Sequence, residues 1–414
     1  MSSFPAVRSF SPPRVSRRAA LAAGVGGLAA LWQPGRAVAH PNHGGVVPDP
    51  RNRFKEPIEL TRFDVIRLAG PGGTVTAVRA TDADGGVGVV PAHGRLPQIR
   101  SLFESLAAPY FTGRDARDLP TLIDHVDTAE RNYKFVGMPF WNAVAHCELA
   151  VWDLLGRRAG LSCTDLLGRR RRRRIAVYVS RFDRDTTPGQ AVLQASEDLE
   201  ATGADAVKLK VGRRMSTTPD QNARDLAMVA LARKTWGDDV EILLDANGSY
   251  TSDEAVRAAT RFADHGVGFL EEPCDWRDVE ATLRAREKLD AKGVRIDLAG
   301  GEQDSSLPVW RRFAKAKLFR PMQPDLFYVG GAVRLLTVAA LADGAKLPVT
   351  PHAPRAGLSA YPDTAVRATI ANLGRVQEYR HSPDLRDGFV TVPTGPGWGL
   401  PWDDAAVRAA KRAA

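Results

Sequence analysis

Residues 206–212 read AVKLKVG, a short apolar run in which Lys208 and Lys210 are separated by one residue. Side chains alternate along a β-strand, so the two lysines project from one face while Val207, Leu209 and Val211 point the other way. Two ammonium groups held this close repel each other, and repulsion lowers a lysine pKa toward the range that a general base needs. Exposure at the surface is the ordinary explanation of such a pair, and the rest of the chain decides between the two.

Seven further β-rich runs accompany this one and alternate with helical patterns such as residues 253–265. They cover residues 175–180, 240–247, 267–273, 296–302, 318–325, 347–353 and 376–381. Eight strands alternating with helices are typical of a (β/α) barrel. An open, doubly wound sheet is the competing fold, but no G-x-G-x-x-G motif follows any of these runs. The sequence therefore predicts an α/β barrel over residues 175–381.

The chain before the barrel has a different order of elements. Residues 58–70 and 74–90 are predicted strands, and a glycine-rich turn at residues 70–73 separates them. Apolar residues at helical spacing then recur up to residue 165. Strands followed by a run of helices indicate an α+β domain over residues 54–165, preceded by a linker at residues 40–53.

Composition and charge limit the possible partners. The chain has 414 residues and a formal net charge of +9, but residues 1–39 hold five arginines and no acid, which leaves +4 for the remainder. Arg169–Arg174 form six consecutive arginines without interleaved aromatic residues, so we interpret them as a solvated linker and predict no nucleic-acid partner. The three cysteines lie far apart and predict neither a disulfide framework nor a zinc motif.

The first 39 residues resemble a twin-arginine export signal. Arg17 and Arg18 precede an apolar stretch at residues 19–32, and residues 37–39 read AVA, which suits a small-residue cleavage site. The apolar stretch is shorter than the roughly 20 residues that cross a bilayer. We therefore expect a periplasmic or secreted protein without a permanent membrane anchor, and an unprocessed basic tail is the alternative.

Nearly every predicted barrel strand ends in a charged side chain, and in (β/α) barrels the chemistry lies at the carboxyl ends of the strands. Asp245, Glu271 and Glu302 end three successive strands, so their carboxylates are expected to converge. Three anions this close raise one another's pKa unless a cation neutralises them. An all-oxygen set suits a hard divalent ion, Mg²⁺ first and Mn²⁺ second. A salt-bridge network with arginines or with Lys208 is the alternative.

Groups for proton transfer are expected beside this metal site. A metal that holds a substrate carboxylate favours loss of the proton from the adjacent carbon, and Lys210 is the candidate base. Lys208 is its electrostatic partner. His352 ends the seventh strand, where Asp325 from the sixth strand can orient its imidazole and raise its basicity.

Seven spaced motifs together resemble the enolase superfamily and, within it, the mandelate racemase subgroup. They are K-x-K (208–210), DANGSY (245–250), EEP (271–273), GGE (300–302), QPDLFYVGG (323–331), PH (351–352) and EY (378–379). The resemblance covers residues 54–405. It implies a modified TIM (β/α)7β barrel with an N-terminal α+β capping domain, a C-terminal segment at 382–414 that returns to that domain, and one essential Mg²⁺ per active site.

The resemblance also assigns roles position by position. Lys210 becomes the base on one face of the substrate, with Lys208 as its partner, and His352 with Asp325 becomes the acid/base dyad on the other face. Glu378 becomes a hydrogen-bonding contact to the substrate. The implied metal ligands are Asp245, Glu271 and Glu302, with Glu271 preferred over Glu272.

The acid-sugar dehydratases of that subgroup are the enzymes that the sequence resembles. This implies dehydration of an aldonate or aldarate to a 2-keto-3-deoxy acid, with His352 protonating the departing hydroxyl. A racemase or epimerase uses the same layout, and a binding protein that has lost turnover is a third hypothesis. Loops are expected to contribute substrate contacts through His93, Tyr133 and Arg181. The resemblance further implies a small carboxylate substrate and a homo-oligomer, either a dimer or an octamer.

Overall fold

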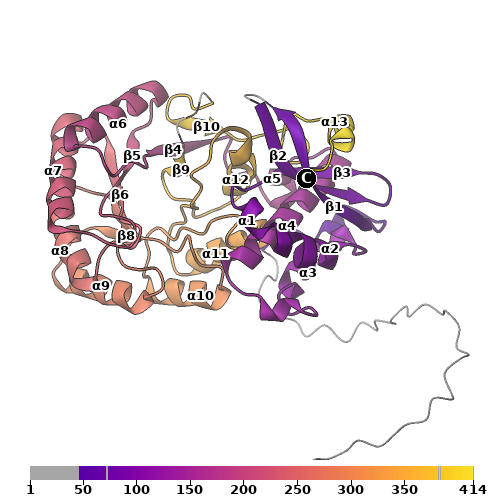
Figure 1. Cartoon of the computed structure of the whole chain (residues 1–414), viewed down its shortest axis with the longest axis horizontal. Helices are drawn as coiled ribbons and strands as arrows, with labels where there is room; N and C mark the ends of the chain where they lie inside the picture. Colours follow the sequence, from indigo (N-terminus) through magenta and orange to yellow (C-terminus); the bar gives the residue numbers. More distant parts are fainter. Residues whose placement is uncertain (1–45, 71–72, 381, 383, 414) are drawn as a thin grey trace, which may run out of the picture. The chain divides into compact units, whose positions relative to one another are not determined.

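Five parallel strands form the wall that carries the charged strand ends. They are β4 (Arg174–Ser180), β5 (Ala206–Lys210), β6 (Glu241–Asp245), β7 (Phe269–Glu271) and β8 (Asp297–Ala299), paired side by side in that order. A helix follows each strand: α6 (Pro188–Thr202), α7 (Pro219–Trp236), α8 (Ser252–Ala263), α9 (Val279–Ala291) and α10 (Leu307–Ala316). Figure 1 shows these helices in succession around the outside of the strands. The strands are buried along almost their whole length, as parallel strands covered by helices must be.

The curled sheet continues beyond β8 through single bridges and closes on its first strand. Gly300 pairs with Met322, Met322 with Val349, and Val349 with Leu373, while β9 (Gln377–Tyr379) pairs with β4. Sequence analysis predicted full strands at 318–325 and 347–353, and this was wrong. Each segment contains two prolines, which cannot donate a ladder hydrogen bond. Each segment therefore pairs with its neighbours through a single residue, Met322 or Val349. The predicted modified α/β barrel is otherwise confirmed, with α11 (Ala332–Gly344) and α12 (Tyr361–Arg367) in its last part.

The computed structural model describes residues 46–70, 73–380, 382 and 384–413. The predicted export signal at residues 1–39 therefore lies outside the described residues. The described residues belong to one compact unit, and the predicted borders between linker, capping domain, barrel and C-terminal segment stay predictions.

The N-terminal part is an antiparallel sheet followed by helices. Strands β1 (Leu60–Gly70), β2 (Gly73–Asp82) and β3 (Val87–Pro91) pair in sequence order. Residues 74–90, predicted as one strand, are divided by a turn at 83–86, where the Asp82 carboxylate accepts hydrogen bonds from the backbone N–H groups of Asp84 and Gly86. The helices are α1 (Leu96–Leu102), α2 (Ala108–Phe111), α3 (Leu119–His125), α4 (Met138–Ala159) and α5 (Cys163–Leu167). Single turns lie at η1 (Pro50–Asn52), η2 (Phe103–Ala107), η3 (Ala116–Asp118), η4 (Asn132–Lys134) and η5 (Gly357–Ala360).

Helix α4 joins this sheet to the barrel. The buried carboxylate of Glu148 accepts hydrogen bonds from the Trp152 indole and from the backbone N–H groups of Ala332 and Val333, at the start of α11. These amides have no partner within their own helix, so the Glu148 oxygens satisfy them, although burial raises the pKa of this carboxyl group to about 7. A single buried acid therefore fixes a barrel helix to α4.

Strand β3 lies against α4 with its backbone in direct contact. A Cβ built on Gly88 would lie 2.2 Å from the carbonyl oxygen of Ala150 and 2.2 Å from the amide nitrogen of Leu154. Only glycine permits this approach, because any other residue would push the strand away from the helix.

The end of the chain returns to the N-terminal sheet. Strand β10 (Phe389–Thr391) pairs antiparallel with β4, and α13 (Asp404–Ala409) follows. Arg79 of β2 donates hydrogen bonds to the carbonyl oxygens of Val407 and Arg408, and the Trp402 indole donates to that of Ala69. These contacts hold the end of the chain against β1 and β2.

Three side chains of the six-arginine run donate to backbone carbonyl oxygens. Arg171 and Arg172 bond to the turn after α12, at Thr369 and Ile370, and Arg170 bonds to Pro393. These three arginines therefore connect the segment before β4 to the turn after α12 and to Pro393, instead of forming a free basic patch. In the part of the chain that the structure describes, no helix combines the length and the apolar character needed to traverse a bilayer. The three cysteines are buried and unpaired.

Candidate active site

Three charged side chains stand in one row across neighbouring strands. The parallel register places Lys210 opposite Asp245 and Asp245 opposite Glu271, and each is the last residue of its strand. All three side chains are buried. The carboxyl edge of the sheet thus brings together groups that lie about 60 residues apart in the chain.

The two lysines of β5 have different partners. The Nζ of Lys208 lies 2.7 Å from Glu271 Oε2 and 2.9 Å from Glu378 Oε1. Burial disfavours the charged lysine, but these carboxylates outweigh it and hold the pKa of Lys208 well above its usual range. Lys210 is ion-paired with Asp245, and its Nζ lies 3.2 Å from Asn247 Oδ1. Each ammonium group therefore has its own carboxylate partner.

His352 and Asp325 are in direct contact at the far end of the row. His352 Nδ1 lies 2.8 Å from Asp325 Oδ2, and His352 Nε2 lies 3.1 Å from Glu302 Oε2. The other Asp325 oxygen accepts hydrogen bonds from the backbone N–H groups of Phe327 and Tyr328, which fix the carboxylate. Burial lowers the pKa of His352, but the nearby acids, Glu302 foremost, outweigh it and raise that pKa to about 9.

Sequence analysis missed Arg355, which shares Asp325 with the histidine. Arg355 Nη2 lies 2.7 Å from Asp325 Oδ2, and its Nη1 lies 3.1 Å from Asp363 Oδ1. Burial raises the pKa of Asp325, but Arg355 and His352 outweigh it and keep that pKa far below its usual range. Asp325 therefore remains ionised beside His352. The only available signal was the position of Arg355 three residues after His352 in the same loop.

Asn247 is a second residue that sequence analysis did not single out. It has a left-handed backbone, with φ of 43°, and its side-chain Nδ2 lies 3.3 Å from Asp245 Oδ2 and 3.3 Å from Glu272 Oε2. Its Oδ1 also accepts a hydrogen bond of 2.6 Å from Arg184. Asn247 thus connects Lys210, the Asp245 carboxylate and an arginine of the β4–α6 loop. The DANGSY motif contained this signal.

The acids of the row have the donor chemistry of a divalent-cation site. Asp245, Glu271 and Glu302 are at most 7 % exposed, and Glu271 Oε1 is buried without a hydrogen-bond partner. Burial is the largest cause that raises the pKa of Glu302 well above its usual range; His352 opposes it, and repulsion from Glu272, Glu271 and Asp245 adds to it. A hard cation relieves this repulsion and supplies the missing partner, so the donor chemistry fits Mg²⁺ or Mn²⁺.

The rotamers of these acids are set by ion pairs instead. Asp245 contacts Lys210, Glu271 contacts Lys208, and Glu302 contacts His352. Among the residues that the structure describes, no three side chains of His, Cys, Asp or Glu are already grouped to hold an ion. The salt-bridge alternative from the sequence thus describes the present arrangement. Metal binding requires Asp245 and Glu302 to exchange these partners.

A pocket of about 620 Å³ opens beside His352. His93 lines it, and the Arg95 Nε donates a hydrogen bond of 2.8 Å to the Tyr328 hydroxyl on its wall. Burial, foremost, and the nearby Arg355 lower the pKa of His93 to about 3, so its imidazole is neutral. The positively charged lining residues are Arg95, Arg355 and Arg380.

Two residues predicted as substrate contacts do not line this pocket, and their role stays a prediction. Arg181 turns to helix α6, where it forms an ion pair of 2.6 Å with Asp198 and a hydrogen bond with Gln194. Tyr133 lies in η4 with 61 % of its surface exposed, and it does not line the pocket. Phe182, two residues after the end of β4, lies nearer the site: its ring centroid is 5.4 Å from Lys210 Nζ and 5.1 Å from Arg380 Cζ.

Comparison with known proteins agrees with this geometry. Residues 190–406 match the enolase C-terminal domain-like family. The chain belongs to the enolase superfamily. Its solved structural neighbours include a mandelate racemase/muconate lactonizing protein from Paracoccus denitrificans complexed with magnesium, with a TM-score of 0.75 and 26 % identity over 86 % of this chain and 99 % of that one.

Two curated relatives of this superfamily enzyme act on sugar acids or their lactones, by their names. D-gluconate dehydratase of Thermoproteus tenax is 28 % identical over 342 residues, which are 78 % of this chain and 67 % of that protein. D-galactarolactone cycloisomerase of Agrobacterium fabrum is 30 % identical over 281 residues, or 62 % of this chain and 71 % of the relative. The relatives thus include both dehydratases and isomerases.

Proposed function

We propose that this enzyme dehydrates a sugar acid, an aldonate or an aldarate, to a 2-keto-3-deoxy acid. One observation carries the proposal: Lys210 and His352 stand at opposite ends of a row of buried acids, in contact with Asp245 and Glu302 respectively. A substrate held between them meets a proton-transfer group on each side. Dehydration needs both, because one group removes the α-proton and the other protonates the hydroxyl that leaves.

The residues divide the reaction as follows. Lys210, released from Asp245, takes the α-proton, and the electrons of the C–H bond form the carbon–carbon double bond of an enol. His352 gives a proton to the β-hydroxyl as the C–O bond breaks and water leaves. The enol then becomes the 2-keto acid by protonation at carbon 3. Asp325 orients His352 through the hydrogen bond of 2.8 Å.

The acids of the row would hold one Mg²⁺ per active site, or Mn²⁺ in its place. The proposed ligands are Asp245, Glu271 and Glu302. When bound, the ion supplies Lewis-acid stabilisation of the negative charge that develops on the substrate carboxylate. Lys208 lies 4.0 Å from Asp245 Oδ2 and bridges Glu271 and Glu378, so it keeps these acids in place.

The pocket supports a polyhydroxylated acid as the substrate. Its wall presents neutral His93, the hydroxyl groups of Tyr328 and Ser359, and three arginines. Hydroxyl groups of a sugar chain can form hydrogen bonds with His93, Tyr328 and Ser359, and a second carboxylate can pair with an arginine. Glu378, whose Oε2 lies 3.9 Å from His352 Nε2, is the proposed contact near the reacting carbons.

A racemase or epimerase is the second candidate, and the same pair of residues favours it. Lys210 and His352 could exchange a proton on opposite faces of one carbon without loss of a hydroxyl. The D-galactarolactone cycloisomerase relative also carries the name of an isomerase. The two reactions differ in product, so one experiment separates them.

The test is a screen of the purified protein with Mg²⁺ against aldonic and aldaric acids. Semicarbazide detects a 2-keto product, and NMR in D₂O detects exchange at the α-carbon. A 2-keto-3-deoxy product supports dehydration, whereas deuterium at the α-carbon with all hydroxyl groups retained supports the isomerase. If no acid gives a 2-keto product or deuterium exchange, both proposals are contradicted and a binding protein is favoured.

Two variants locate the activity. Lys210→Ala and His352→Asn should each abolish turnover, while Lys288→Ala and His265→Asn serve as matched controls outside the site. Lys288 is an exposed residue of α9 that pairs with Asp253, and His265 lies on the turn after α8. Loss of activity in the controls would contradict the assignment.

Export through residues 1–39 and assembly into a homo-oligomer are proposed on the sequence alone. Periplasmic fractionation of cells that express the full chain, beside an Arg17→Lys, Arg18→Lys variant, tests the first. Sedimentation of the purified protein tests the second.

A further inference from the structure

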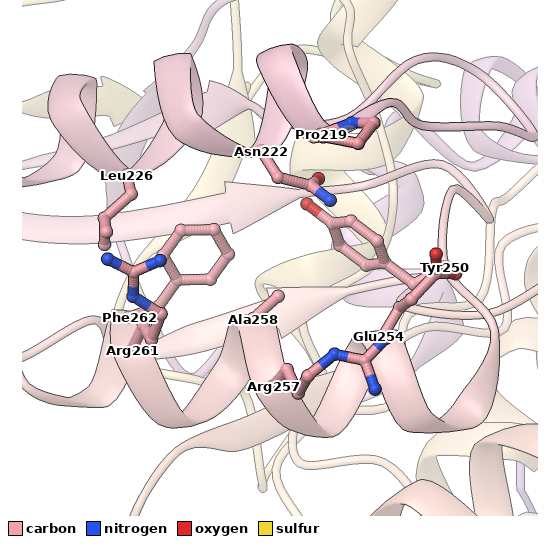
Figure 2. Close-up of a pocket in the computed structure, with 9 residues that line it drawn as sticks. All are labelled: Pro219, Asn222, Leu226, Tyr250, Glu254, Arg257, Ala258, Arg261 and Phe262. Carbon is pink, nitrogen blue, oxygen red and sulfur yellow. The ribbon is translucent and has the colours of Figure 1, made fainter.

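A second cavity lies away from the row of acids, between helices α7 and α8 on the outside of the barrel. Its volume is about 330 Å³, and none of its lining residues belongs to the candidate active site. Figure 2 shows the lining side chains between the two helices. The apolar part of the wall consists of Pro219, Leu226, Ala258 and Phe262.

Tyr250 places a buried polar group in this cavity. The residue is 4 % exposed, and its hydroxyl oxygen is buried without a hydrogen-bond partner. In Figure 2 the phenol points between the helices, with its hydroxyl toward Asn222. Burial raises the pKa of Tyr250 well above its usual range, so the hydroxyl keeps its proton and can donate it. A buried donor without an acceptor is unfavourable, and a ligand that accepts its hydrogen bond is stabilised here.

The rim of the cavity is positively charged. Arg257 and Arg261 lie four residues apart on α8, so they share one face of the helix, and both are exposed. Within the described part of the chain, neither arginine forms an ion pair. The one acid of the lining, Glu254, is engaged at the start of α8, where it accepts hydrogen bonds from the amide and the hydroxyl of Thr251. Besides burial, the negative charges of Asp225 and Glu254 raise the pKa of Tyr250. Asp225 is paired with Arg224 at 2.9 Å, and Glu254 interacts with Arg257 as well as with Thr251. The two arginines therefore exceed the one acid of the lining and favour an anionic ligand at the rim.

We propose that this cavity binds a small carboxylic acid with an apolar body. The carboxylate accepts the hydrogen bond of Tyr250 and is neutralised by the arginines of the rim. The hydrocarbon part lies on Leu226, Ala258 and Phe262. A sugar acid does not suit this site, because its hydroxyl groups would be buried against an apolar wall. The ligand is therefore of a different class from the proposed substrate.

Isothermal titration of the Mg²⁺-loaded full chain with hexanoate tests the proposal, and hexan-1-ol is the neutral control ligand. We expect hexanoate to bind, and the alcohol to bind at least about tenfold more weakly, because a hydrogen bond to a charged group is lost with the carboxylate. Tyr250→Phe, which keeps the ring and removes the hydroxyl, should weaken hexanoate about tenfold.

Arg257→Ala is the second variant, and its exposed position makes a folding defect unexpected. It should weaken hexanoate severalfold, whereas Arg284→Ala, an exposed arginine on the next helix, should leave the affinity unchanged although it removes the same charge. Absence of binding at millimolar hexanoate would overturn the proposal. Binding that neither Tyr250→Phe nor Arg257→Ala weakens would place hexanoate elsewhere, for example at the Mg²⁺ site, and would overturn it as well.

Discussion

Lys210 and Asp245 face each other across the parallel pair β5–β6, and the lysine ammonium group occupies the carboxylate that is proposed to hold the metal. The same carboxylate cannot serve both cations fully. The proposed base, Lys210, is therefore ion-paired with a proposed metal ligand, Asp245. We expect metal binding at Asp245 to weaken this ion pair and release the lysine. Glu302 and His352 repeat this relationship at the other end of the row, with 3.1 Å between Oε2 and Nε2.

Removal of the lysine should strengthen metal binding while it abolishes turnover. In Lys210→Ala the Asp245 carboxylate loses its competing cation, so Mg²⁺ should bind severalfold more tightly by calorimetry. Loss of the base should lower kcat by roughly 10²–10⁴-fold. Lys288→Ala should change neither value. Unchanged or weaker Mg²⁺ binding in Lys210→Ala would show that the lysine does not compete for Asp245.

The Asp325–His352 contact predicts a separation of two proton transfers. In Asp325→Asn the imidazole loses the carboxylate that orients it and stabilises its charged form, so kcat for dehydration should fall by roughly 10²–10⁴-fold. Exchange of the α-proton with D₂O should persist, because Lys210 contacts Asp245 and not Asp325. NMR measures both on one sample.

Asp297→Asn is the matched control, since Asp297 begins β8 at the opposite end of the strand from the site. Equal loss of exchange and dehydration in Asp325→Asn would contradict separate roles for the two groups.

The row of strand ends could be predicted from the sequence because it depends on local rules. Alternation along a strand and the parallel register of neighbours together determine that Lys210, Asp245 and Glu271 meet. The partners of loop residues do not follow such rules. Arg355 reaches Asp325 only through the conformation of the loop after His352, so their distance does not follow from sequence pattern.

The outward position of Arg181 has a related cause. Arg181 lies one residue beyond β4, which suggested an active-site position, but the side chain turns outward to Asp198 of α6. The Arg181–Asp198 ion pair depends on how α6 packs against the strands, and hydrophobic periodicity does not predict that packing angle. The expected strand at 347–353 also failed for a physical reason, since its prolines remove ladder donors although the apolar pattern remains.

Arg95 is expected to select substrates with two carboxylates. Its guanidinium group lies on the pocket wall, held by the Tyr328 hydroxyl at 2.8 Å. In Arg95→Ala the ratio of kcat/KM for an aldarate to that for the matching aldonate should fall about tenfold or more, because only the aldarate loses a charged hydrogen bond. Arg277→Ala, an exposed arginine paired with Asp275, should leave the ratio unchanged. An equal loss for both substrates would assign Arg95 to general binding.

His146 should make the fold sensitive to acid. It is fully buried, with Nδ1 2.7 Å from the Asn142 carbonyl oxygen and Nε2 accepting the backbone N–H of His93 at 3.0 Å. A second proton would place an N–H group against that N–H. Burial is the main cause that lowers its pKa from 6.5 to about 4.

The unfolded chain binds this proton more readily than the folded protein does. The contribution of neutral His146 to the free energy of unfolding is therefore complete above pH 6.5, and it is lost as the pH falls from 6.5 to 4. One residue should account for about 3 kcal/mol of that loss. Urea unfolding across this range should show a shallower dependence in His146→Gln than in the wild type or in His265→Gln. Parallel curves for all three would show that His146 does not set the acid response.

Gly88 should be the least replaceable glycine of the N-terminal sheet. Its alanine variant would bring a methyl group to 2.2 Å from two backbone atoms of α4, and the helix backbone cannot yield as a flexible side chain can. The strand must shift, which should lower the free energy of unfolding by about 1–3 kcal/mol or more. Gly189→Ala in the first turn of α6 is the control, because a Cβ there meets no atom within 4 Å. Since β3 leads directly into His93 and Arg95, the Gly88→Ala protein that still folds should also show a raised KM. An unchanged melting temperature would mean that β3 and α4 separate without cost, and the pocket wall would then not depend on their contact.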